Sequence, residues 1–178
     1  RGLGDVYKRQ EVGHTIGLPH NMGSSSAYHV DSLRSPTFTA NHGVAPSIMD
    51  YARFNYVAQP EDGVTNFYPR VGEYDIWSVK WGYTYFDGED QNTEKEILNK
   101  WIKEKSNNYQ YWFGYSNGID PRSQTESIGS DNMDASYYGL LNLKRIVPNL
   151  INWTYEDGKN YDDLKESVSY THLRAHET

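Results

Sequence analysis

The stretch from position 10 to position 20 reads Gln10-Glu11-Val12-Gly13-His14-Thr15-Ile16-Gly17-Leu18-Pro19-His20. It matches the pattern H-E-x-x-H-x-x-G-x-x-H at every fixed position except the first, where Gln10 stands for His. On an α-helix, positions 10 and 14 lie one turn apart on the same face, so imidazoles there can bind one metal ion. Gly17 can leave the helix with a positive φ, which allows His20 to return as a further ligand.

The glutamate of this pattern indicates the chemistry. Three neutral imidazoles leave Zn²⁺ a free coordination position for water, and the metal lowers the pKa of that water to about 7. Glu11 lies next to the first ligand position and can reach such a water without binding the metal. It would take the proton as the water attacks a peptide carbonyl and pass it to the leaving amine. The stretch therefore predicts one catalytic Zn²⁺, His14 and His20 as metal ligands, and Glu11 as a catalytic residue.

A second motif, Ser47-Ile48-Met49-Asp50-Tyr51, resembles the Met-turn of the metzincin zinc metalloproteases, in the S-I-M-x-Y form of the astacin and serralysin families. The later Asp75-Ile76 and Trp81-Gly82 look like the helix that follows this turn. The resemblance implies that Met49 lies beneath the zinc-binding histidines as a structural floor. It also implies that Tyr51 is a fifth ligand or a hydrogen-bond donor to the oxyanion.

The whole stretch Glu11–Ser167 resembles the met-zincin domain of large secreted bacterial zinc metalloproteases. This resemblance implies a zinc-dependent metalloendopeptidase with a protein or peptide substrate, located outside the cell, in the periplasm or at the cell surface. The implied fold class is α+β, with this chain holding mainly the helical C-terminal subdomain of a metzincin and a mostly helical extension. Residues 11–86 would be the C-terminal part of the catalytic domain, and residues 87–167 the extension.

Both ends of the chain resemble translated adapter sequence, and we interpret residues 1–10 and 168–178 as non-native. Two hypotheses for Gln10 follow. Either Gln10 is the last adapter residue, and the native His was lost at the junction, or Gln10 is genuine. In the second case the chain would be a catalytically inactive metzincin-fold module that binds peptide or glycan. Under either hypothesis we expect the chain as written to be inactive.

Composition restricts the remaining classes of function. The 178 residues carry a formal net charge of -7, which does not favour nucleic acid as a partner. The absence of cysteine excludes thiolate metal sites and leaves His and carboxylates as ligands. No apolar run reaches the length of a membrane span. The oligomeric state is not predicted.

Hydrophobic periodicity and capping residues predict the local structure. Residues 21–46 are polar, and we expect a long irregular loop without core residues. Helices are predicted over 72–83 with Gly82 as C-cap, from Thr93 with a Thr93/Glu96 capping box, over 131–147 and from 162. Alternating aromatic residues over 109–115 predict a strand.

Other candidate ligands have simpler explanations. His29 and His42 lie in the polar segment and could replace the missing ligand if Gln10 is genuine, although a lone His there is usually just exposed. Asp120, Asp131 and Asp134 lack the regular ligand spacing of a calcium loop. Asp131 is better explained as a helix N-cap.

Overall fold

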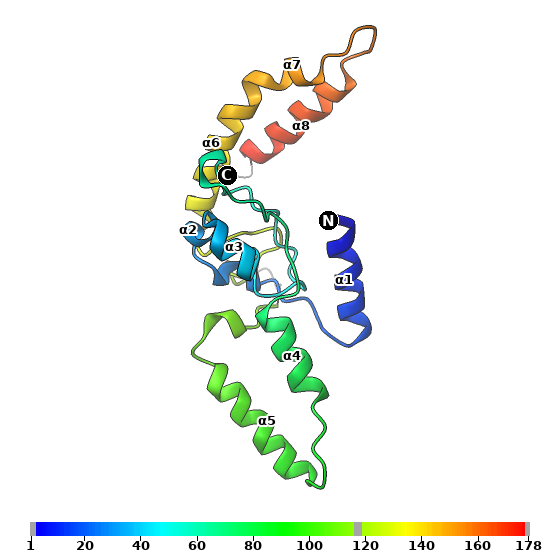
Figure 1. Ribbon diagram of the computed structural model, residues 1–178, viewed down its shortest axis with the longest axis vertical. Helices are drawn as coiled ribbons and strands as arrows, with labels where there is room; N and C mark the ends of the chain where they lie inside the picture. Colours follow the sequence, from blue (N-terminus) through cyan, green and yellow to red (C-terminus); the bar gives the residue numbers. More distant parts are fainter. Residues whose placement is uncertain (1–2, 116–118, 177–178) are drawn as a thin grey trace.

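A computed structural model describes residues 3–115 and 119–176 of the chain (Figure 1). Helices α1 and α4–α8 are joined to two short central helices by turns and extended coil. Their bounds are α1 (Leu3–Thr15), α2 (Val30–Leu33), α3 (Pro36–His42), α4 (Glu73–Tyr83), α5 (Gln91–Lys105), α6 (Asn132–Ile146), α7 (Leu150–Thr154) and α8 (Asp162–His176), with 3-10 turns η1 (Ser24–Ala27), η2 (Pro60–Asp62), η3 (Tyr109–Tyr111) and η4 (Val147–Asn149). No strand occurs in the described part of the chain, so the expected α+β class is wrong there: the fold is all helical.

The strand predicted over 109–115 is the clearest error. The side chain of Asn108 accepts a hydrogen bond from the backbone N–H of Gln110 and begins η3 instead. The ring of Tyr109 then stacks on Trp112, with centroids 5.0 Å apart. The alternating aromatic residues therefore reflect local stacking around a 3-10 turn, and not the two faces of a sheet.

The hydrophobic core lies in the middle of an elongated molecule. Helices α4 and α5 extend from one end, α6–α8 extend from the other, and α1 lies at the side (Figure 1). The core consists of Tyr28, Val30, Leu33, Val44, Val57, Ile128 and Ala135. Four of these seven residues belong to 21–46, so the prediction that this segment contributes no core is wrong. Its helices have four and seven residues, too few to show a helical period in the sequence.

The longer helices agree better with the sequence. The predicted helices over 72–83, over 131–147 and from 162 are confirmed as α4, α6 and α8, and Asp131 caps α6 by accepting from two backbone N–H groups. Two caps were assigned wrongly. Gly82 lies inside α4, whose last residue is Tyr83 and whose C-cap is Thr84, and α5 begins before Thr93 because the carboxylate of Asp90 caps it. No helix in the described ranges is both long and apolar enough to cross a membrane.

The turn formed by residues 47–51 (the 47–51 turn) is buried against η1. The backbone N–H of Ser47 donates to Ser24 Oγ at 2.8 Å, and the backbone N–H of Ser25 donates to Asp50 Oδ2 at 2.5 Å. Asp50 is 1% exposed, and burial raises the pKa of its carboxyl to about 8, although the N–H of Ser25 acts in the opposite direction. Among the residues that the structure describes, Asp50 Oδ1 has no hydrogen-bond partner.

This burial predicts a pH dependence of stability in the metal-free protein. The pKa of Asp50 in the folded state, about 8, lies above the value of about 3.9 expected in the unfolded chain. The folded state therefore binds more protons between these values, and Asp50 reduces the stability as the pH rises through that window. Asp50→Asn removes this loss and can still accept from Ser25. Between pH 5 and pH 8 the free energy of unfolding of the Asp50→Asn variant should fall by roughly 1–4 kcal/mol less than that of the wild type. Urea denaturation in the presence of a chelator measures both profiles, and parallel profiles would contradict the prediction.

Candidate metal centre

His14 and His20 meet although six positions separate them. Their Nε2 atoms lie 3.1 Å apart, and their rings pack edge to face. Gly17, with φ of 82°, makes this possible, because it reverses the chain directly after α1. The N–H of Gly17 bonds the carbonyl of His14, and the N–H of Leu18 bonds that of Gly13. These two bonds form a Schellman motif, which directs the chain back toward the last turn of α1.

The other ring nitrogens establish the tautomers of both histidines. His14 Nδ1 lies 2.9 Å from the carbonyl oxygen of Leu18, and His20 Nδ1 lies 3.1 Å from that of Met49. A carbonyl oxygen can only accept, so each Nδ1 carries the hydrogen and donates it. Nε2 is then the nitrogen of each ring that can offer a lone pair, and the two Nε2 atoms face each other. Histidines that bind metals commonly donate their other ring N–H to a backbone carbonyl in this way.

Two facing lone pairs repel each other unless a proton or a metal ion lies between them. Two nitrogen ligands at about 2.0–2.1 Å from one tetrahedral zinc ion would lie about 3.3–3.4 Å apart. The separation of 3.1 Å between the two Nε2 atoms is close to that value. His14 and His20 therefore fit zinc as two of its ligands.

Position 10 does not supply the third ligand. Gln10 is 3% exposed, and its Nε2 donates to the carbonyl oxygen of Asp50 at 2.9 Å. In the described residues no three His, Cys, Asp or Glu side chains come together as a metal-binding group. The side chain at position 10 nevertheless bonds the same kind of acceptor as His14 and His20, a backbone carbonyl, and its acceptor Asp50 directly follows Met49, whose carbonyl holds His20.

The alternative histidines have other roles. His29 caps α2, where its Nδ1 accepts from the backbone N–H of Asp31 at 3.2 Å. His42 Nδ1 lies 2.6 Å from Glu73 Oε1. Neither belongs to a metal-binding group in the described part of the chain, so they do not replace the ligand missing at position 10.

Met49 packs directly under α1. It is 1% exposed and lies in a small core with Val6, Ile48 and Leu18. A Cβ atom at Gly13 would lie only 2.3 Å from Met49 Sδ, so only glycine allows this approach next to His14. Sequence reasoning did not single out Gly13. The available signal was a glycine inside a helix, which is unfavourable there without a packing reason.

Asp75 in the first turn of α4 holds the 47–51 turn in place. Its Oδ1 accepts from Ser47 Oγ at 2.5 Å. Its Oδ2 accepts from the backbone N–H groups of Ile48 at 2.7 Å and Gly72 at 2.9 Å. Burial raises the pKa of this carboxyl, while the three donors act in the opposite direction. The sequence indicated Asp75 only as part of a helix motif, and its contact with the turn was missed.

Tyr51 borders His20, and Glu11 lies on α1 three residues before His14. The ring of Tyr51 lies 4.7 Å from that of His20, centroid to centroid, and Tyr51 is 40% exposed. Glu11 is exposed on α1, one residue after the buried Gln10. Both side chains are therefore accessible to a molecule that binds at the histidines.

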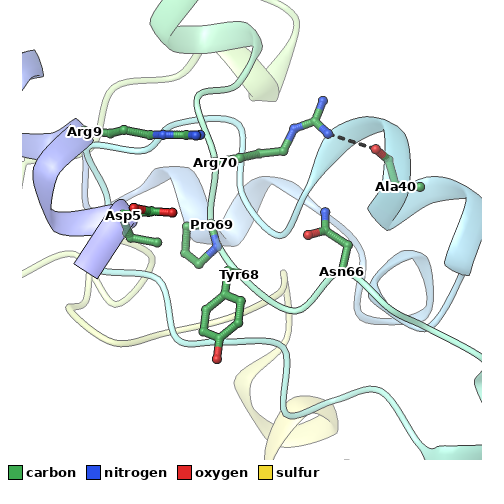
Figure 2. A pocket seen from close by; sticks show the side chains of 8 residues that line it. Asp5, Arg9, Ala40, Asn66, Tyr68, Pro69 and Arg70 are labelled. Carbon is green, nitrogen blue, oxygen red and sulfur yellow. Dashed lines mark hydrogen bonds between the residues drawn. The ribbon is translucent and has the colours of Figure 1, made fainter. Parts of the chain in front are cut away.

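A separate pocket of about 330 Å³ lies between α1 and residues 66–70. Figure 2 shows Arg9 and Arg70 on the same side of it, with Arg70 bonded to the carbonyl of Ala40. A second bond joins Arg70 to the carbonyl of Asn41, so its guanidinium caps the end of α3. His14 and His20 do not line the pocket, and part of its wall belongs to residues 1–10, which the sequence predicts to be non-native. We therefore do not place the functional site there.

One of three comparisons with known proteins gives a match. Neither the search of curated proteins nor that of solved structures found a match. A family model described as Met-zincin matches residues 8–177, nearly the whole chain and including both histidines and the 47–51 turn. The chain therefore belongs to the Met-zincin family, which indicates a function of the metalloprotease type.

Proposed function

We propose that this centre, with a histidine at position 10, is that of a zinc-dependent metalloendopeptidase that hydrolyses peptide bonds in proteins or peptides outside the cytoplasm. The observation that carries the proposal is the pair of Nε2 lone pairs, 3.1 Å apart, on two rings whose Nδ1–H groups both donate to backbone carbonyls. Imidazoles held in this way are prepared for one metal cation. The family match supports the same class of activity.

Each residue has a distinct role in this proposal. His14 and His20 would hold the zinc ion, which, when bound, activates water and polarises a carbonyl. Glu11 accepts the proton of the attacking water and later donates it to the leaving amine. The Tyr51 hydroxyl donates a hydrogen bond to the oxygen that becomes negative in the transition state. Met49, in the floor of the Met-turn, supports α1 through its contact at Gly13.

The second candidate is an inactive metzincin-fold module that binds peptide or glycan. Its support is the buried amide of Gln10, which is bonded to the carbonyl of Asp50 and offers zinc only a poor, neutral donor. The two candidates differ at position 10, so this position carries the decisive experiment.

Gln10→His should convert weak zinc binding into tight binding of one ion. The new ring can donate to the carbonyl of Asp50, as the amide now does, and present its other nitrogen to the metal. We expect an affinity at least ~100-fold higher, since loss of an outer-shell partner alone costs ~10–100-fold. Competition with a chromogenic chelator measures it. Gln59→His is the matched control, because Gln59 is also buried and bonded to a backbone carbonyl. Equal affinity in both variants would exclude position 10 as a ligand position.

Glu11→Gln, introduced into a complete catalytic domain that carries His at position 10, should abolish hydrolysis while zinc remains bound. Glu11 transfers protons and does not bind the metal, so its loss should lower the rate at least ~10²–10⁴-fold. A fluorogenic peptide and metal analysis give the two readouts. Glu96→Gln on α5 is the control for an exposed glutamate. Loss of zinc from the Glu11 variant would mean that Glu11 is a ligand.

Tyr51→Phe in the same protein should reduce turnover ~10²–10³-fold, because it removes a single oxyanion donor. The bond forms mainly in the transition state, so KM should change little. Steady-state kinetics separates the two constants. Tyr85→Phe, at a residue that is 84% exposed, should leave both unchanged. Unchanged turnover in the Tyr51 variant would reduce Tyr51 to a packing residue.

A further inference from the structure

We infer that Asn21 is a positioning residue of the metal centre. Residues 112–114, which belong to the C-terminal part of the chain (residues 87–167), orient His20 through it. The inference rests on the proposed function. Asn21 follows His20 directly and is fully buried. Its side chain bonds the backbone of residues 112–114 at two points. Nδ2 donates to the carbonyl of Trp112 at 3.0 Å, and Oδ1 accepts from the N–H of Gly114 at 2.9 Å.

The backbone of Asn21 reaches the acceptor that holds His20. Its N–H donates to the carbonyl oxygen of Met49 at 3.1 Å. The same oxygen accepts the Nδ1–H of His20, also at 3.1 Å. Asn21 is thus tied to Met49 on one side and to residues 112–114 on the other. A shift of Asn21 would change the bond that sets the tautomer of His20.

Two glycines allow this close contact. The N–H of Gly23 donates to the carbonyl of Gly114 at 3.0 Å. A Cβ atom at Gly23 would lie 2.9 Å from Gly114 Cα, and one at Gly114 would lie 2.8 Å from Gly23 Cα. Neither φ requires glycine, so the close backbone approach is the physical reason for glycine at both positions. Residues 21–23, which directly follow His20, and residues 112–114 therefore pack backbone against backbone.

A second contact from the C-terminal part reaches Tyr51. The N–H of Glu126 donates to the carbonyl of Tyr51 at 3.0 Å, and the N–H of Arg53 donates to the carbonyl of Ser127 at 3.4 Å. Glu126 has φ of 64°, an unfavourable conformation for a residue other than glycine, and it forms an ion pair with Arg53. The C-terminal part thus supports two neighbours of His20, the buried Asn21 that follows it in the chain and the exposed Tyr51 whose ring lies against it.

The first test needs no metal and uses the full chain. Nitrogen NMR of the imidazoles, at a pH where the rings are neutral, reports which nitrogen of His20 carries the hydrogen. We expect the Nδ1–H form in the wild type and a mixture of tautomers in Asn21→Ala. Asn55→Ala is the matched control, because Asn55 is equally buried and also bonds a carbonyl (Leu33) and an N–H (Ala58). If Asn21→Ala does not fold, Asn21→Asp decides, because it can accept from Gly114 but cannot donate to Trp112.

A single tautomer of His20 in the Asn21 variant, or an equal change in the Asn55 variant, would overturn the inference. The second measurement is zinc affinity in the Gln10→His background. There Asn21→Ala should weaken binding ~10-fold, as expected for an outer-shell residue, and Asn55→Ala less than ~2-fold. If Gln10→His itself fails to bind zinc, the proposed function is wrong, while the tautomer of His20 still decides whether Asn21 positions it.

Discussion

Two consecutive backbone carbonyls, those of Met49 and Asp50, are the constraint on which the centre depends. The first accepts the Nδ1–H of His20, and the second accepts the amide of Gln10. Because a carbonyl oxygen has no hydrogen to donate, it leaves the opposite ring nitrogen of a histidine free as a ligand. The direction of these carbonyls therefore decides which ring nitrogen is free to bind a metal ion. The 47–51 turn has to be held rigidly for the histidines to work.

Two carboxyl groups at the start of α4, the buried Asp75 and the partly buried Glu73, provide that rigidity. Asp75 bonds three donors around the turn, and two residues earlier Glu73 accepts from Tyr28 and pairs with His42. Burial alone would raise the pKa of Glu73, but these bonds outweigh it and lower the pKa overall. A buried charge is costly unless it is hydrogen-bonded, so each bond also excludes alternative arrangements of the turn. The start of α4 thereby supports the centre from outside it.

Gln10 shows how little separates the two candidate functions. Its side chain is buried and donates to the carbonyl of Asp50, an acceptor that the Nδ1–H of a histidine can also use. The family match does not distinguish these candidates, because it concerns the whole chain. The C-terminal part also contributes to the surroundings of the centre, since Ile128 and Ala135 lie in the central core and residues 112–114 bond Asn21.

By itself the sequence determined whatever depends on local spacing. Positions 10 and 14 share a helix face, Gly17 takes the predicted positive φ, and α4, α6 and α8 follow from periodicity and caps. Only the tertiary structure decided which polar residues form the centre. Asn21 bonds residues more than ninety positions away, and Asp75 bonds a turn about 27 positions earlier. Short-range patterns report the faces of single elements, whereas such contacts depend on how distant segments pack. That is also why residues 21–46, polar in sequence, hold much of the core, and why the aromatic residues over 109–115 form no strand.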